Sequence, residues 1–202
     1  QHQRQLNPDY VPSPQQYEQV QQRHQQILSL IPYNGDYWTA YADMQLWHLA
    51  NTPNITPTQQ KQLKEGILSA YDTAIKQRPT WPYAYMNFAI IKARFGEIDD
   101  NFKNAVQKAN HLGTWEADVI HPTIELGLAL WSQLDAKTQQ VVASAVERSI
   151  TWKVSAAQNQ KEKIFALSLV GAYQKQAEIC ALMSNQGQKA DQDLVASFHH
   201  LA

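Results

Sequence analysis

The sequence has little of several features that mark particular classes of protein. Cys180 is its one cysteine among 202 residues, so no internal disulfide and no cysteine pair for zinc can form. It contains no run of about 18 apolar residues, the length needed to cross a bilayer. Its 17 basic and 18 acidic residues give a formal charge of -1, which argues against a nucleic-acid surface because such a surface needs clustered lysine and arginine. These features predict an ordinary globular chain of one domain.

Motifs for catalysis are also missing. The seven histidines form no His-Glu-x-x-His pair, and none of the seven glycines forms a phosphate-binding loop. No nucleophile elbow is present. Carboxylates at 99–100, Glu116, Asp118 and Glu125 have the chemistry for glycoside hydrolysis, but helix caps and exposed faces explain them more simply. We therefore expect no enzymatic activity, metal or cofactor, with a lyase or hydrolase on an all-α scaffold as a minor alternative.

The chain does contain helical periodicity almost throughout. Apolar residues recur at spacings of three, four and seven, and no alternating strand pattern occurs. Thr56 and Gln59 have capping-box spacing, with Pro57 at the first helical position. Helices are predicted over 15–31, 36–50, 57–78, 82–95, 99–112, 115–133 (with a break near His121-Pro122), 135–150, 164–183 and 194–201. Residues 1–14 carry three prolines and are predicted to be an extended linker before a helical-repeat domain over 15–202.

The joint between two helices at residues 78–85 suggests how the domain is built. Pro79 cannot continue the preceding helix, Thr80 is a good N-cap, and Pro82 fits a first turn. Such a helix, corner, helix joint is typical of tetratricopeptide hairpins. A bulky residue, an apolar residue and a small residue recur with the same spacing at 38–42 and 85–89, and apolar-small pairs follow at 126–127 and 170–171. These patterns favour an all-α array of antiparallel helical hairpins, an α-solenoid, over a chance recurrence in an unrelated helical protein.

Aromatic residues are the best candidates for a binding surface, since six Trp and nine Tyr are many for this length. In a tetratricopeptide-like frame, one face of the helix over 82–95 projects toward an inner groove, where an arginine can bind a carboxylate. The candidate residues are Trp81, Tyr83, Asn87, Ile90, Arg94 and Trp115. The alternative is that the aromatics form hairpin core, which we favour for Trp38, Tyr85 and Trp131.

Three stretches of the middle of the chain resemble a known family. Residues 78–84 (Arg-Pro-Thr-Trp-Pro-Tyr-Ala), 96–99 (Gly-Glu-Ile-Asp) and 112–116 (Leu-Gly-Thr-Trp-Glu) resemble the VpsP family of bacterial polysaccharide-biosynthesis proteins. Two departures are Thr114, where a proline is expected, and the lack of a second cysteine to accompany Cys180. The resemblance implies a small helical accessory protein associated with exopolysaccharide gene clusters, and it carries over no catalytic residues.

The resemblance leads to a functional expectation with one main alternative. We expect a non-enzymatic scaffold that docks envelope proteins of polysaccharide synthesis or export. The alternative is a carbohydrate-binding module that grips nascent polysaccharide through exposed aromatics. A periplasmic location is expected, with tethering by a segment that precedes Gln1, and the cytoplasm is the alternative location. Nucleic acid is not expected as a partner.

Overall fold

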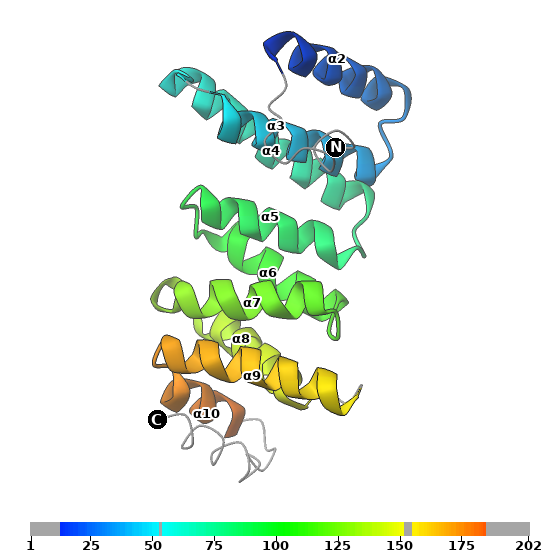
Figure 1. Ribbon diagram of the computed structural model, residues 1–202. Coiled ribbons are helices and arrows are strands. Elements are labelled where there is room, and N and C mark those ends of the chain that lie inside the picture. Colours follow the sequence, from blue (N-terminus) through cyan, green and yellow to red (C-terminus); the bar gives the residue numbers. More distant parts are fainter. Residues whose placement is uncertain (1–12, 53, 152–154, 185–202) are drawn as a thin grey trace. The chain divides into compact units, whose positions relative to one another are not determined.

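A computed structural model describes residues 13–52, 54–151 and 155–184, and these residues form helices joined by short turns. The described part of the chain contains nine α-helices and one 3₁₀ turn, and the helices pack mostly on their neighbours in sequence (Figure 1). The prediction of an all-α protein is therefore confirmed. The chain divides into two compact units, Gln1–Pro79 and Thr80–Ala202, which are described separately.

The first unit contains α2 (Pro14–Leu30), α3 (Gly35–Asn51) and α4 (Pro57–Gln77). Two capping boxes begin helices here: Ser13 with Gln16 before α2, and Thr56 with Gln59 before α4. The second box is as predicted. The helix predicted over 36–50 begins slightly earlier, because Asn34 is the N-cap and accepts the hydrogen bond from the Asp36 amide, so Asp36 lies inside the first turn.

Helices α3 and α4 form the best-packed pair of the first unit. Ala42 and Ala74 are fully buried between helices, and Tyr71, 2 % exposed, donates its phenol hydrogen bond to Asp43. At the start of α3, a Cβ on Gly35 would lie 3.0 Å from the Ala74 carbonyl oxygen of α4. A larger residue at position 35 would therefore push the two helices apart. An ion pair between Arg78 and Asp36 joins the same ends.

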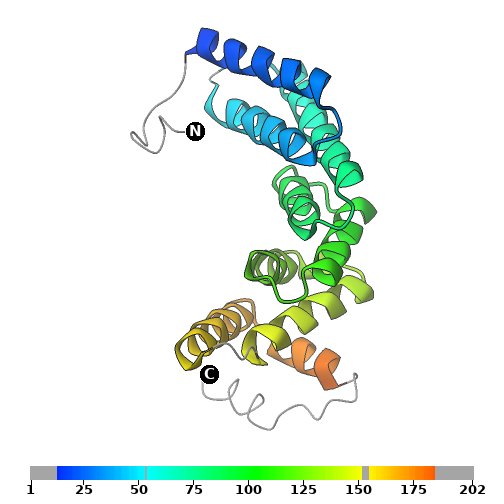
Figure 2. The ribbon, with the colours of Figure 1, turned by 90° about the vertical axis from the view of Figure 1, so that its right-hand side faces the viewer.

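The six α-helices described within the second unit lie in two layers. Helices α5 (Pro82–Arg94), α7 (Ala117–Ala129) and α9 (Ala156–Ala172) form one layer. Helices α6 (Asp100–Leu112), α8 (Ala136–Thr151) and α10 (Gln176–Ser184) form the other, and the 3₁₀ turn Trp131–Gln133 connects α7 to α8. Figure 2 shows the first layer nearly end-on, with the second layer beside it. Each helix of a layer packs on the next helix of the same layer.

Local signals set most of these boundaries. Asp99 and Asp135 accept hydrogen bonds from the amides of Phe102 and Thr138 at the starts of α6 and α8. Gly96, with φ +76°, follows α5 in a Schellman turn, in which the Glu97 amide donates to the Lys92 carbonyl at 2.9 Å.

Three details of the predicted helices are wrong. Trp81, not Thr80, is the N-cap of α5, and it makes no side-chain cap bond. Helix α7 runs through Pro122 without a break, since a proline this close to the N-terminus costs one hydrogen bond that packing offsets. The polar stretch 158–163 lies inside α9, and the helix predicted over 164–183 is split into α9 and α10 by a Schellman turn in which Gln174 has φ +53°.

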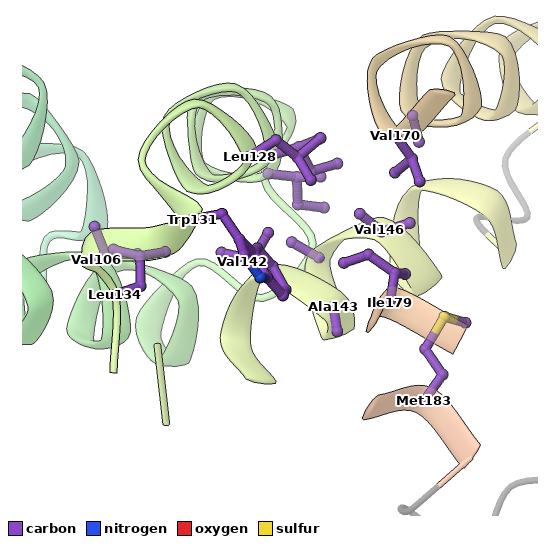
Figure 3. Packing of buried hydrophobic residues seen from close by; sticks show 14 of the residues in the cluster. Val106, Leu128, Trp131, Leu134, Val142, Ala143, Val146, Val170, Ile179 and Met183 are labelled. Atoms are coloured by element: carbon purple, nitrogen blue, oxygen red, sulfur yellow. The ribbon is translucent and has the colours of Figure 1, made fainter. Parts of the chain in front are cut away.

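The core of the second unit lies between its two layers. Figure 3 shows Leu128, Trp131, Val142, Val146 and Ile179 converging from α7, the 3₁₀ turn, α8 and α10. Val142 and Val146 are fully buried, and Trp131 is 8 % exposed, so its predicted place in the core is confirmed. Apolar side chains from α7, the 3₁₀ turn, α8 and α10 thus form a continuous core.

Two predicted segments fall mainly outside the described residues. The linker over 1–14 falls mainly on residues outside the described ranges, as does the helix over 194–201; of the linker, Ser13 and Pro14 begin α2 instead. A single domain over 15–202 stays a prediction. Among the described helices, none combines the length and apolar character that a bilayer span needs.

Candidate functional site

The predicted aromatic site lies where the start of α5 meets the turn before α7. Gly113 makes this contact possible, because a Cβ there would come within 2.9 Å of the Pro82 ring and 3.0 Å of a Val119 methyl group. Pro82 itself is buried. The absence of a side chain at Gly113 therefore lets the 113–116 turn pack directly on the first turn of α5.

The aromatic residues at this junction are held together by specific contacts. The rings of Trp81 and Tyr83 meet edge to face, with centroids 5.1 Å apart. The Tyr83 hydroxyl donates a hydrogen bond of 2.7 Å to Glu116 Oε2. That hydrogen bond raises the pKa of the Tyr83 phenol, with smaller contributions from burial and from the charges of Glu116 and Asp118. Glu116, the residue that follows Trp115, is thus held to Tyr83 at the start of α5.

Both tryptophans of the junction are open to solvent. Trp81 is 40 % exposed and Trp115 is 55 % exposed, which is unusual for the largest apolar side chain. We call Trp81, Tyr83, Trp115 and Glu116 the aromatic junction. It offers two exposed indoles, a tyrosine ring and one carboxylate, a set suited to packing against a protein side chain or a sugar ring.

The other three predicted site residues lie elsewhere on α5. Ile90 packs against Met86, Ala109 and Val119, where α5, α6 and α7 meet, so it is partly core. Asn87 is half-buried, and Arg94 is exposed at the far end of the helix, about 16 Å along the axis from Tyr83. The structure brings Trp81 and Tyr83 together with the turn that carries Trp115. A groove that includes Asn87, Ile90 and Arg94 stays a prediction.

The burial of Lys92 was not predicted. It is 4 % exposed, and its Nζ lies 2.7 Å from Glu97 Oε2 and 3.1 Å from Asp99 Oδ2. Burial alone would lower the pKa of the ammonium group, but its hydrogen bonds to the two carboxylates and their charges outweigh burial and raise it. Lys92 thereby clamps the turn between α5 and α6. A lysine four residues before the glycine of a Gly-Glu-x-Asp segment at a helix end is the signal that would have indicated this.

The clamp predicts a specific pH dependence of stability. Burial opposes ionisation of Asp99, but its hydrogen bond from the Phe102 amide and the Lys92 charge outweigh burial and lower its pKa below the ordinary 3.8. A carboxyl with a lowered pKa stabilises the fold above its unfolded pKa, and that contribution disappears as the pH falls through its folded pKa. Asp99→Asn keeps an N-cap but removes the charge. We expect the variant to be less stable at pH 7, with the difference vanishing in acid.

Urea unfolding followed by far-ultraviolet circular dichroism over a pH series measures this difference. Asp100→Asn is the matched control, because the Asp100 side chain is 92 % exposed and contacts Lys103 rather than Lys92. Its stability curve should follow that of the unmodified chain. A constant deficit for Asp99→Asn at every pH would contradict the clamp.

A second polar network lies in the core between α6, α7 and α8. Asn110 Nδ2 donates 2.7 Å to Thr123 Oγ1, and Asn110 Oδ1 accepts from Arg148 Nη2 at 2.8 Å. Among the described residues, Arg148 Nε is buried without a hydrogen-bond partner. Burial lowers the pKa of the Arg148 guanidinium. These contacts join three helices, so we assign them a structural role.

The first unit contains a polar hollow that sequence reasoning missed. Its volume is about 560 Å³, and it is bounded by α2, α3, α4 and the 52–55 loop. We call it the α2–α4 hollow. Its lining residues are Tyr17, Gln21, Gln45, His48, Thr52, Asn54, Ile55, Gln59, Gln62 and Leu63. No motif marks these residues, since scattered glutamines on three amphipathic helices look like ordinary exposed positions.

No metal-binding chemistry is gathered at either place. Among the described residues, no three His, Cys, Asp or Glu side chains are grouped so as to hold a metal ion. In comparisons with known proteins, no protein-family model matches the sequence and no curated protein matches it significantly. The fold and the two surfaces define an all-α protein with an exposed aromatic junction and a separate polar hollow.

Proposed function

We propose that the chain is a non-enzymatic accessory protein of bacterial exopolysaccharide synthesis or export, which docks partner proteins of the cell envelope. The aromatic junction is the docking surface in this proposal. The proposal includes a tetratricopeptide-like array of helical hairpins and a periplasmic location with an N-terminal tether. The resemblance of residues 78–84, 96–99 and 112–116 to the VpsP family gives the polysaccharide context.

The observation that carries the docking role is the exposure of Trp81 and Trp115 on a fixed support. Tryptophan and tyrosine dominate the binding energy of protein interfaces, because they bury a large area while losing few rotamers. The contacts of Tyr83 with Trp81 and Glu116 order the surface before a partner binds. The two-layered packing of the second unit supports the hairpin array, since it alternates helices as a helical repeat does.

Affinity capture from the native cell tests the docking role. The tagged full chain should recover polymerase or export components of the glycan machinery, identified by mass spectrometry after crosslinking. Trp81→Ala with Trp115→Ala should reduce that recovery by about tenfold or more, as loss of a hot spot does. Tyr173→Ala is the matched control, because Tyr173 is an aromatic of similar exposure, 42 %, in the same unit. Recovery of chaperones alone, or equal loss with Tyr173→Ala, would count against the proposal.

The second candidate function is a carbohydrate-binding module that holds polysaccharide at the aromatic junction. The edge-to-face pair of Trp81 and Tyr83 favours it, since exposed rings stack on the apolar faces of sugars. Oligosaccharide from the native polymer should then change tryptophan fluorescence, and Trp81→Ala should abolish the change. Fluorescence that stays constant at millimolar oligosaccharide would leave protein docking as the function of the junction.

A further inference from the structure

The α2–α4 hollow has an uncommon lining, in which polar groups are numerous and formal charge is absent. Four glutamines, one asparagine, one threonine and one tyrosine contribute hydrogen-bonding groups, and no Asp, Glu, Lys or Arg belongs to the lining. Burial lowers the pKa of the His48 imidazole, which favours its neutral form. A charged ligand would therefore lose its hydration in the hollow without meeting an opposite charge.

The wall of the hollow is ordered by contacts within the protein. The rings of Tyr17 and His48 stack with centroids 3.7 Å apart and an interplanar angle of 9°. His48 Nδ1 lies 2.8 Å from Thr52 Oγ1, which ties the imidazole to the loop after α3. Tyr17 is 8 % exposed, so it acts as a rigid wall rather than as an open stacking platform.

Gln45 presents a hydrogen-bond donor from this wall. Its side chain is buried, with 6 % exposure, and its Oε1 accepts from the Tyr17 hydroxyl at 3.4 Å. The Gln45 Nε2 group forms no hydrogen bond within the part of the chain that the structure describes. This donor is not sealed inside the protein but is open to solvent, so that a ligand or water can accept its hydrogen bond. Since Gln45 lines the hollow, its ligand would be bound there.

The side-chain amide of Gln59 is a second hydrogen-bond donor, and the capping box of α4 orients it. Its Oε1 accepts from the Thr56 amide at 3.0 Å and from the Thr56 hydroxyl at 2.8 Å, as part of the capping box of α4. The box fixes the side-chain oxygen and leaves the Nε2 group without a partner among the described residues. Two orientated amide donors thus belong to one uncharged hollow.

From this arrangement we propose that the α2–α4 hollow is a binding site for a short neutral oligosaccharide. Gln45 and Gln59 donate hydrogen bonds to hydroxyl oxygens, and the amides of Gln21 and Gln62 are placed to bond further hydroxyls. A sugar hydroxyl both donates and accepts, which matches a lining of amides and hydroxyls. The volume of about 560 Å³ lies in the range of small-molecule sites.

A saccharide fits the hollow better than a peptide does. A peptide carries side chains that need apolar or charged subsites, whereas the lining offers Ile55 and Leu63 as its aliphatic residues. The hollow is separate from the aromatic junction in sequence and belongs to the other unit. The inference therefore does not rest on the proposed docking function, and either can fail without the other.

Gln59→Glu gives a sharp test because it changes the donor and spares the fold. Glutamate keeps the capping-box acceptor for the Thr56 amide, but it replaces the amide donor with a carboxylate. Gln16→Glu is the matched control, since Gln16 occupies the same position in the capping box of α2 and does not line the hollow. Gln62→Ala and Gln60→Ala form a second matched pair of exposed residues on α4, of which Gln62 alone lines the hollow.

Titration calorimetry of the full chain measures binding of neutral disaccharides and trisaccharides of glucose, galactose and mannose. Glucuronic-acid oligosaccharides and an acetylated, amidated tripeptide of serine and glycine are the comparison probes. We expect a neutral trisaccharide to bind with Kd of about 1 mM or below. Gln59→Glu should weaken it by about tenfold or more, as loss of a hydrogen-bonded donor from the site does. Gln62→Ala should also weaken binding, whereas Gln16→Glu, Gln60→Ala and Trp81→Ala should leave it unchanged.

Several results would overturn the assignment. One is the absence of a heat of binding for every neutral saccharide at about 10 mM. Another is that Gln59→Glu binds the neutral trisaccharide as tightly as the unmodified chain does. A third is that the tripeptide or the acidic sugars bind more tightly than the neutral saccharides. Loss of saccharide binding in Trp81→Ala with binding intact in Gln59→Glu would place the sugar at the aromatic junction instead.

Discussion

Replacing Asn110 by alanine is expected to lower the free energy of unfolding by about 3 kcal/mol. The amide is 5 % exposed and connects Thr123 on α7 to Arg148 on α8. Alanine removes the acceptor of the Arg148 Nη2 hydrogen bond, and the Nε group of the same guanidinium is already buried without a partner among the described residues. A desolvated cation would then lose a principal hydrogen bond, which costs more than the loss of a neutral pair.

A double-mutant cycle identifies the cause of that loss. Arg148→Met removes the charge and keeps an unbranched apolar side chain of similar length, so Arg148→Met alone should change stability by less than Asn110→Ala. The double variant should recover much of the stability that Asn110→Ala loses, with a coupling of about 1–2 kcal/mol in urea unfolding. Strictly additive effects would mean that Asn110 acts through Thr123 and not through the guanidinium.

Gly127→Ala is the second large expected effect, with a loss of about 1–3 kcal/mol. A Cβ at this position would lie 2.8 Å from Val142 Cγ1 and still closer to Cγ2, inside the contact between α7 and α8. Val142 is fully buried and β-branched, so it has little freedom to rotate away. The gain of about 1 kcal/mol that alanine normally brings to a helix interior is too small to offset the clash.

Gly66→Ala provides the matched comparison for this substitution. Gly66 also lies inside a helix, α4, but a Cβ there meets no atom within 4 Å. It should therefore raise the free energy of unfolding by about 0.5–1 kcal/mol. Opposite signs for the two glycines in urea unfolding are the expected result. If both alanine variants were stabilising, α7 and α8 would not be in close contact at Gly127.

Local sequence signals were sufficient for most of the fold. The capping box at Thr56 and Gln59, the N-caps Asp99 and Asp135, and the positive φ of Gly96 are each decided by a few neighbouring residues. The small residues expected at helix contacts include Ala42, Ala89 and Gly127, all of them buried. Gly171 does not fit that expectation, because the nearest atom to its Cβ position is 3.9 Å away.

Predictions failed where a weak local signal met a stronger tertiary one. Pro122 was expected to break its helix, but its neighbours Ile120, Thr123 and Ile124 are fully buried and hold the turn in place. Polar residues at 158–163 were not expected to be helical, yet they belong to α9. Glu162 there is 4 % exposed, and its Oε2 atom lies 2.5 Å from His121 Nε2 on α7. The helix expected over 164–183 is interrupted after Ala172 by a turn in which Gln174 has a left-handed backbone that no residue pattern indicated.

By itself, the sequence determined that the chain is helical, where most helices begin and end, and that Trp81 and Tyr83 belong together. These properties follow from hydrogen bonds and periodicities that span one or two turns of chain. Only the tertiary structure decided that Lys92 is buried between two carboxylates, that Arg148 depends on Asn110, and that Gln45 and Gln59 line one uncharged hollow. The reason is that burial and ligand geometry depend on residues far apart in the chain, whose meeting no local pattern records.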